Sequence, residues 1–190
     1  MKNIILLIVV LILTGCEAST PVKLHNLGDV DQSKISILTS YCSKECKAAI
    51  EKDGNFKNAF SSTFGTSIAG ITIQSVNQIL GSTSYTSNCG GSGNYDVFNS
   101  SWDWSFKLEL APGNNVIYAS VDNCNIRNRT LHILNLKLKA GHKYALVAVS
   151  RKIKGSGYYE YQAIEWYPAL YDYMSGKVVS GQSEYGWLKP

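Results

Sequence analysis

The sequence lacks the patterns that mark most enzymes and nucleic-acid-binding proteins. It contains no HExxH, no phosphate-binding loop and no complete G-x-S-x-G elbow; segments 65–70 and 181–186 each miss the elbow by one residue. It also lacks blocks of like charge, and the net charge of its 190 residues is only +4. So mild a charge does not indicate a nucleic-acid partner. We therefore expect no catalytic residues, no cofactor and no nucleic-acid ligand.

Long apolar runs are missing as well. The run from residue 4 to residue 13 has ten apolar residues. As a helix it would extend about 15 Å, half of the roughly 30 Å hydrocarbon thickness of a bilayer, so it is too short to span. It follows a short start that contains Lys2. This order is typical of a secretory signal peptide.

The end of this run has a specific pattern, Leu13-Thr14-Gly15-Cys16. It resembles the lipobox of bacterial lipoproteins. The resemblance implies that the Cys16 thiol carries a diacylglyceryl group, that cleavage follows Gly15 and that the new amine is acylated too, with palmitate as a typical chain. Glu17, where Asp would favour the inner membrane, implies the outer membrane of a Gram-negative cell. The alternative is an ordinary signal peptide whose Cys16 joins a disulfide.

The rest of the chain divides into a polar segment and one domain. Residues 16–32 are polar and have no clear periodicity, which is typical of a flexible tether. A hydrophobic content of 45% is enough for a single core in the remainder. We expect a lipoprotein signal peptide at 1–15, a lipidated tether at 16–32 and a β-sandwich domain at 33–190.

Apolar and polar residues alternate with a period of two through most of this domain. In segment 101–110 the residues on one face are Trp102, Trp104, Phe106, Leu108 and Leu110. Such alternation predicts a half-buried strand. The "APG" at 111–113 then predicts a turn, and residues 114–122 a partner strand, so that the two form a hairpin.

A second pair of strands follows the same plan. Segment 131–139 leads through "AGH" at 140–142 into segment 143–150, which predicts another hairpin. Further candidate strands are segments 34–41, 69–76, 158–167 and 177–180. About eight strands separated by turns predict an all-β fold, an antiparallel β-sandwich.

Helix is scarce, and four cysteines accompany the strands. Residues 43–52 predict one short helix, with Ser43 as its N-cap. An even number of cysteines in an exported chain suggests disulfides with three possible connectivities, and one helical turn would bring the first two together. We favour pairing within Cys42–Cys46 and within Cys89–Cys124. A zinc site is the alternative, but paired CxxC motifs are missing and the histidines lie elsewhere.

Three segments of the C-terminal half carry a further resemblance. "LELAPGNNVIYASV", "LKLKAGHKYALVAV" and "AIEWYPALYDYMSGKVVSG" lie within residues 100–181. They are similar to a pattern in uncharacterised bacterial lipoproteins: a PG turn, an AGHxY turn, and a tryptophan strand followed by a D-x-x-[ST]-G-x-V-V hairpin. The resemblance implies an Ig-like or transthyretin-like sandwich and implies no chemistry.

The histidines of these segments have ordinary explanations. His142 follows Gly141 in a predicted turn, so we expect a solvated side chain rather than a base. His132 alternates with leucines of its strand, which favours a position at the margin of the core.

Aromatic residues crowd the last part of the chain, and they allow two interpretations. Alternating aromatics commonly fill and flank a sheet. Tyrosine and tryptophan also form recognition surfaces, because they offer rigid contact area with a polar tip. The candidates for such a recognition face are Tyr159, Tyr161, Trp166, Tyr171 and Tyr173.

These observations predict a lipid-anchored protein of the cell envelope. The leading expectation is a non-enzymatic structural or protein-binding module, held at the membrane by its lipid and paired with another envelope protein. The first alternative is a lipoprotein that binds glycan or peptidoglycan through the C-terminal aromatics. An envelope hydrolase is the second and weaker alternative.

Overall fold

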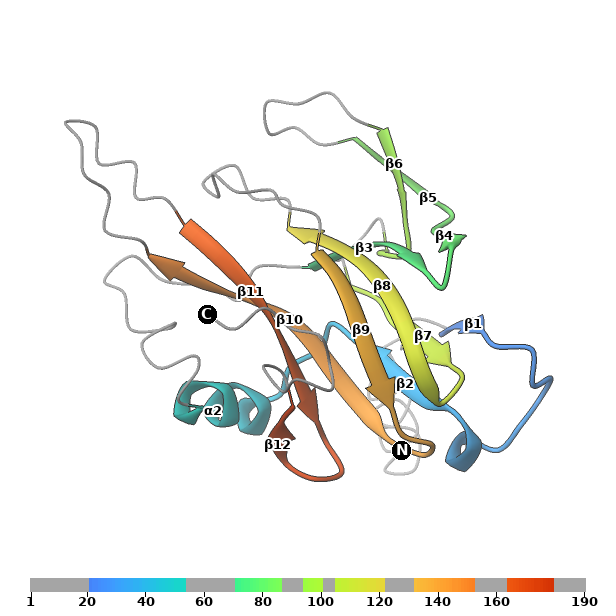
Figure 1. The fold of residues 1–190 in the computed structure, drawn as a ribbon, viewed down its shortest axis with the longest axis horizontal. Coiled ribbons are helices and arrows are strands. Elements are labelled where there is room, and N and C mark those ends of the chain that lie inside the picture. The colour runs from blue at the N-terminus through green and yellow to red at the C-terminus, as the bar shows by residue number, and fades with distance from the viewer. Residues whose placement is uncertain are drawn as a thin grey trace, which may run out of the picture.

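The computed structural model describes residues 21–53, 71–86, 94–100, 105–121, 132–152 and 164–179. In this part of the chain the protein is mostly β, with twelve strands, one α-helix and a single 3-10 turn, η1 (Gln32–Lys34). The strands form three sheets (Figure 1). The expectation of about eight strands was too low, because short edge strands such as β1 (Val22–Leu24) and β4 (Ile79–Leu80) carry too few residues to show a period.

Sheet A is the largest sheet and has six strands. Their order is β1 (Val22–Leu24), β7 (Lys107–Leu110), β2 (Ser36–Thr39), β10 (Lys143–Lys152), β11 (Ile164–Asp172) and β12 (Lys177–Val178). Sheet B has the order β4 (Ile79–Leu80), β3 (Ile71–Val76), β8 (Gly113–Val121) and β9 (His132–Leu138). Sheet C is the pair β5 (Thr83–Thr86) and β6 (Asn94–Val97).

One buried core joins sheets A and B. It takes alternate residues from both sheets, so the two sheets face each other across it. Sheet B contributes Ile73, Ile117 and Leu136, and sheet A contributes Leu108 and Leu146. The alternation read from the sequence marks this inward face correctly at Phe106, Leu108 and Leu110, which are all buried.

The opposite face of sheet A packs against the helix α2 (Lys44–Lys52). Cys46 and Ile50 of the helix form a second buried cluster with Val147 and Ala169 of the sheet. Strand β10 is therefore covered on both faces, which explains why residues 144–149 are apolar without alternation. The helix itself confirms the sequence prediction, since Ser43 is its N-cap and accepts a hydrogen bond from Cys46 N.

The two predicted hairpins are wrong. Strand β7 lies in sheet A and β8 in sheet B, and likewise β9 lies in sheet B and β10 in sheet A. Each turn therefore carries the chain from one sheet to the other. Asn115 Nδ2 braces the first crossing by donating to Ala111 O and Gly113 O at 3.0 and 3.2 Å. In the second, Gly141 N donates to Ile35 O rather than to the preceding strand.

We had expected purely antiparallel sheets, but sheet A also contains parallel pairs. Strand β1 pairs with β7 in parallel, and β2 pairs with β10 in parallel. Both exceptions come from strands at the N-terminal end of the described chain, which are added to a sheet whose other strands lie far away in sequence. Two parallel neighbouring strands need a long connection between them. Here that connection is the chain between β1 and β7, and the chain between β2 and β10.

The predicted boundary at residue 33 is wrong, because the fold begins within the predicted tether. Residues 22–24 form β1, with Val22 opposite Leu108 and Leu24 opposite Leu110. Polar composition predicts a flexible segment, but a short edge strand needs only its backbone hydrogen bonds and a few side-chain contacts.

The hairpin of β3 and β4 forms one edge of sheet B. Its turn residues Asn77 and Gln78 have φ angles of 49° and 70°, the left-handed conformation that tight hairpins use. Asn77 also joins the hairpin to β8, because Val116 N donates to its Oδ1 at 2.8 Å. This brace holds the edge strand β4 in place.

Candidate functional site

Half of the candidate site residues lie outside the part of the chain that the structure describes. These are the lipid attachment residue Cys16, the cysteines Cys89 and Cys124, and the aromatic residues Tyr159 and Tyr161. Trp166 belongs to β11, where its backbone pairs with Ser150. The remaining candidates are Cys42, Cys46, Tyr171 and Tyr173, and these four lie together around the start of α2.

Cys42 and Cys46 form the disulfide that their spacing suggested. Their Cα atoms are 5.4 Å apart, at a sequence separation of 4. Cys46 is fully buried in the cluster under α2, and Cys42 is half-buried where the chain enters the helix. The bond therefore ties the first turn of the helix to the residue that precedes its N-cap.

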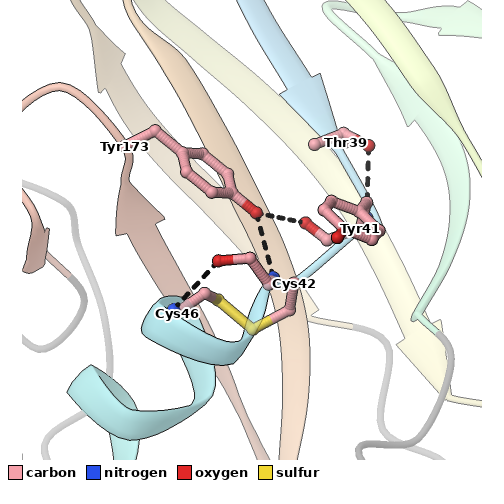
Figure 2. The surroundings of a disulfide bond; sticks show 6 residues. Thr39, Tyr41, Cys42, Cys46 and Tyr173 are labelled. Carbon is pink, nitrogen blue, oxygen red and sulfur yellow. Dashed lines mark hydrogen bonds between the residues drawn. A yellow bond between two sulfur atoms is a disulfide. The ribbon is translucent and has the colours of Figure 1, made fainter.

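Tyr173 holds the same segment from the side of sheet A (Figure 2). Its hydroxyl donates to Tyr41 O at 2.9 Å and accepts from Ser43 N at 3.2 Å. Lys143 Nζ lies 5.2 Å from the centre of its ring. Burial raises the pKa of the Tyr173 hydroxyl, although the bond from Ser43 opposes that shift. The hydroxyl is thus used to fix the chain on either side of Cys42.

Tyr171 does not belong to a recognition face. Only 5% of it is exposed, and it packs under α2 with its ring 5.0 Å from that of Tyr173, edge to face. The assignment to a recognition surface was therefore wrong for Tyr171. Tyr173 is half-buried, and its polar tip already has two partners. These two tyrosines serve to pack the helix on the sheet.

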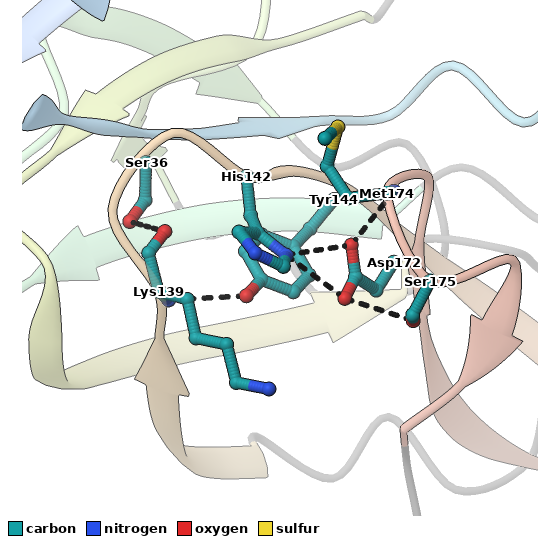
Figure 3. Close-up of polar contacts among 7 residues, drawn as sticks. All are labelled: Ser36, Lys139, His142, Tyr144, Asp172, Met174 and Ser175. Atoms are coloured by element: carbon teal, nitrogen blue, oxygen red, sulfur yellow. Dashed lines mark hydrogen bonds and ion pairs between the residues drawn. The ribbon is translucent and has the colours of Figure 1, made fainter. Parts of the chain in front are cut away.

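A second polar cluster lies at the end of sheet A, where the β9–β10 and β11–β12 turns meet (Figure 3). His142 Nδ1 lies 3.0 Å from each carboxylate oxygen of Asp172. Met174 N and Ser175 Oγ also donate to this carboxylate, each at 2.9 Å. We expected His142 to be a solvated turn residue, and this was wrong because its partner lies thirty positions further along the chain.

The backbone of the β9–β10 turn is fixed by its neighbours. Tyr144 Oη accepts from Lys139 N at 3.0 Å, and Ser36 Oγ donates to Lys139 O at 2.8 Å. Gly141 has a φ of 72°, and a Cβ at this position would lie 3.2 Å from Ser33 O. The AGHxY residues thus form a turn that β2 and β11 both hold, and this links the AGHxY and D-x-x-S-G-x-V-V motifs in space.

Histidine, carboxylate and hydroxyl occur together here, but their order is not that of a nucleophilic triad. In a triad the hydroxyl bonds to the histidine, which the carboxylate orients from its other side. Ser175 instead donates to Asp172, on the same carboxylate that His142 contacts. The carboxylate is buried and central, so the arrangement joins two turns rather than activating the serine.

A histidine and a glutamate are buried against each other next to β1, and the sequence analysis did not predict this contact. His25 Nε2 lies 3.6 Å from Glu109 Oε2, and these side chains are only 2% and 10% exposed. Alternation placed Glu109 on a solvated face of its strand, but the His25 side chain lies against it there. A histidine that directly follows an edge strand gives no sequence signal for this contact. The pair fixes the point at which the chain enters sheet A.

Neither metal-binding groups nor similarity to known proteins assigns a function to these clusters. Among the residues described, no group of three histidine, cysteine or acidic side chains could hold a metal ion. Within the same residues, no helix has the length and apolarity needed to cross a membrane. The chain matches no protein-family model, no characterised protein and no solved structure.

Proposed function

We propose that this chain is a lipoprotein of the cell envelope, held at the membrane by acyl groups on Cys16. The sequence Leu13-Thr14-Gly15-Cys16 carries this proposal. Two or three acyl chains are needed for a stable anchor, because each buried methylene contributes only about 0.8 kcal/mol. Glu17 supports the outer membrane as the destination in a Gram-negative cell.

The anchor is tested by intact-mass spectrometry of the chain purified from membranes. The expected mature chain begins at Cys16 and carries the added mass of its acyl groups. Labelled palmitate should enter the wild-type chain and not the Cys16→Ser variant. A mature chain without lipid, or equal labelling of both, would reject the proposal.

We further propose that the domain is a β-sandwich of the Ig-like or transthyretin-like type. Support comes from the core shared by sheets A and B and from the crossing of the chain between them at Pro112 and at Gly141. Comparison of an experimentally determined structure with known sandwiches tests the type. A strand order unlike either would reject it.

The domain acts, in this proposal, as a non-enzymatic structural or protein-binding module. The observation that favours protein binding is the edge strand β4, where Ile79 and Leu80 are 48% and 66% exposed. Exposed apolar side chains on an edge strand favour a partner that covers them. His142 and Asp172, which could otherwise suggest chemistry, are already joined to each other.

The protein-binding surface is tested by substitution on β4. Ile79→Asp and Leu80→Asp should each abolish cross-linking to an envelope protein that the wild type captures in intact membranes. Ile133→Asp is the matched control, because Ile133 is also exposed but lies on the opposite edge strand β9. Equal loss in all three variants, or in none, would reject β4 as the contact surface.

The glycan-binding alternative has lost part of its support. Two of its five aromatic residues, Tyr171 and Tyr173, pack the helix on sheet A. Binding of muropeptides by the wild-type chain, lost in Tyr159→Ala and Tyr161→Ala, would favour this alternative over the protein-binding module.

A further inference from the structure

The β1–β2 connection and the β9–β10 turn form one end of the molecule (Figure 1). Gly141 N donates to Ile35 O at 2.7 Å, and a Cβ on Gly141 would touch Ser33 O. Ser36 Oγ also donates to Lys139 O. These contacts hold the η1 turn against the β9–β10 turn, so that the two segments lie side by side and form one surface of exposed turns.

This surface is rich in exposed lysines. Four of them are close along the two segments, and we call this set the basic end: Lys34, Lys137, Lys139 and Lys143. The exposed carboxylates in the same described segments are Asp29, which pairs with Lys23 at 2.7 Å, and Asp31, which accepts from Ser33 N. The basic end therefore carries an excess of positive charge.

The surface of α2 has no such excess. Its exposed lysines alternate with acidic residues, and the helix is followed by an aspartate. The charged residues are Lys44, Glu45, Lys47, Glu51, Lys52 and Asp53. This face provides a comparison surface with three substitutable lysines and a balanced charge.

Strand β1 runs toward the basic end and ends beside it. Leu24 pairs with Leu110, which pairs in turn with Ser36, so the last residue of β1 lies in the row of sheet A from which the basic end projects. Val22 is two residues away, about 7 Å along the strand. Leu27, in the loop that follows β1, is 47% exposed and adds an apolar side chain to this end.

The length of chain before β1 limits how far this end can be from an anchor on Cys16. Five residues separate Cys16 from Val22. Fully extended, they allow at most about 20 Å between the two Cα atoms at roughly 3.3–3.6 Å per residue. This limit is much shorter than the roughly 55 Å that a fully extended tether at 16–32 would allow, because residues 22–24 belong to sheet A.

We propose that the basic end, with Leu27 beside it, docks on the anionic lipid surface of the bilayer that holds Cys16. This inference rests on the proposed lipid anchor and adds an orientation to it. Lysines near an anionic leaflet are attracted to it, and the attraction decays within a Debye length of about 8–10 Å. The short chain restricts how far the basic end can move from the leaflet, and α2 lies on the outer face of sheet A.

Lysine acylation on vesicles tests the orientation. The full acylated chain is reconstituted into vesicles of phosphatidylglycerol with phosphatidylcholine, or of phosphatidylcholine alone, and exposed to an amine-reactive ester. Labelling of the basic end should fall at least about threefold on the anionic vesicles, and raised salt should restore it. Labelling of Lys44, Lys47 and Lys52 should be the same on both vesicles.

Matched charge reversals give the second measurement, with Lys143 as the reporter. The triple change Lys34→Glu, Lys137→Glu and Lys139→Glu should make Lys143 labelling equal on the two vesicle types. The control triple, Lys44→Glu, Lys47→Glu and Lys52→Glu, reverses the same charge on α2 and should leave Lys143 protected. Circular dichroism establishes that both variants are folded.

The two proposals fail in different ways. Intact mass showing acylated Cys16, together with equal labelling of the basic end on both vesicles, would overturn the docking alone. Protection of Lys143 in both triple variants would also overturn it. A chain without acyl groups on Cys16 would overturn the anchor, and the docking with it.

Discussion

His142 Nδ1 lies 3.0 Å from both carboxylate oxygens of Asp172, and so joins two turns that are thirty residues apart. Asp172 is buried and also accepts from Met174 N and Ser175 Oγ. A carboxylate with this many partners stabilises the end of sheet A because its removal leaves several donors without an acceptor.

We expect Asp172→Ala to lower the free energy of unfolding by about 2–3 kcal/mol. A double-mutant cycle with His142→Ala, measured by urea unfolding, should give a coupling energy of about 1–3 kcal/mol. Ser175→Ala is the control, since it removes one exposed hydroxyl and should cost only about 0.5–1 kcal/mol. Additive effects of Asp172→Ala and His142→Ala would contradict the direct pairing.

Loss of the Cys42–Cys46 disulfide should destabilise the start of α2. The bond closes a very short loop, so the chain-entropy estimate is roughly 2 kcal/mol for the double variant Cys42→Ser, Cys46→Ser. Urea unfolding of this variant and of the wild type measures the difference. Hydrogen exchange should also become faster in residues 44–47 and remain unchanged in β8. A variant as stable as the wild type would contradict this role.

The hydroxyl of Tyr173 should make the fold sensitive to alkaline pH. Burial raises its pKa above the ordinary value of 10.0, so the folded state holds this proton more tightly than the unfolded state does. The resulting stability is complete below the unfolded pKa and is lost as pH rises through the folded pKa. A tyrosinate also cannot donate to Tyr41 O.

The measurement for Tyr173 compares the wild type with Tyr173→Phe at two pH values. At about pH 8 the variant should be less stable by roughly 1 kcal/mol, because two hydrogen bonds are lost. At about pH 11 that difference should shrink, since the wild type then loses the same bonds. A difference that does not change with pH would exclude Tyr173 as the alkaline-sensitive group.

We expect His25→Ala to weaken the attachment of β1 to sheet A. The change leaves the Glu109 carboxylate buried without the imidazole that faces it, which should cost about 1–3 kcal/mol. Amide hydrogen exchange of residues 22–24 should become faster by more than that of β10. Lys23→Ala is the matched control, and it should have little effect because the Lys23–Asp29 pair is exposed. Equal exchange in the wild type and His25→Ala would contradict this.

The sequence predicted local features of this protein better than the pairing of its strands. The period of two located β7, β8, β9 and β10, and the Ser43 cap and cysteine spacing located α2 and its disulfide. The pairing errors have one cause. "APG" and "AGH" mark a change of direction, but they do not determine whether the next strand bonds to the previous one or crosses to a facing sheet.

For the candidate site residues, too, local features were predicted and long-range contacts were not. Burial of Tyr171 and the partner of His142 depend on where β11 lies relative to α2 and β10, which local patterns do not report. The contact of His25 with Glu109 depends on the parallel addition of β1 to the sheet. Contacts between residues distant in sequence were therefore missed, although the types of residue involved were visible.

Strand β1 has a mechanical consequence for a chain held by its N-terminus. It contains three residues at the edge of sheet A, so a pull on the N-terminal segment loads it before any other strand. Peeling β1 away as far as η1 would increase the maximum span after Cys16 from about 20 Å to roughly 55 Å. The sheet would lose only its outermost strand. In a chain anchored at Cys16, release of β1 would therefore lengthen the connection to the anchor before any other strand separates.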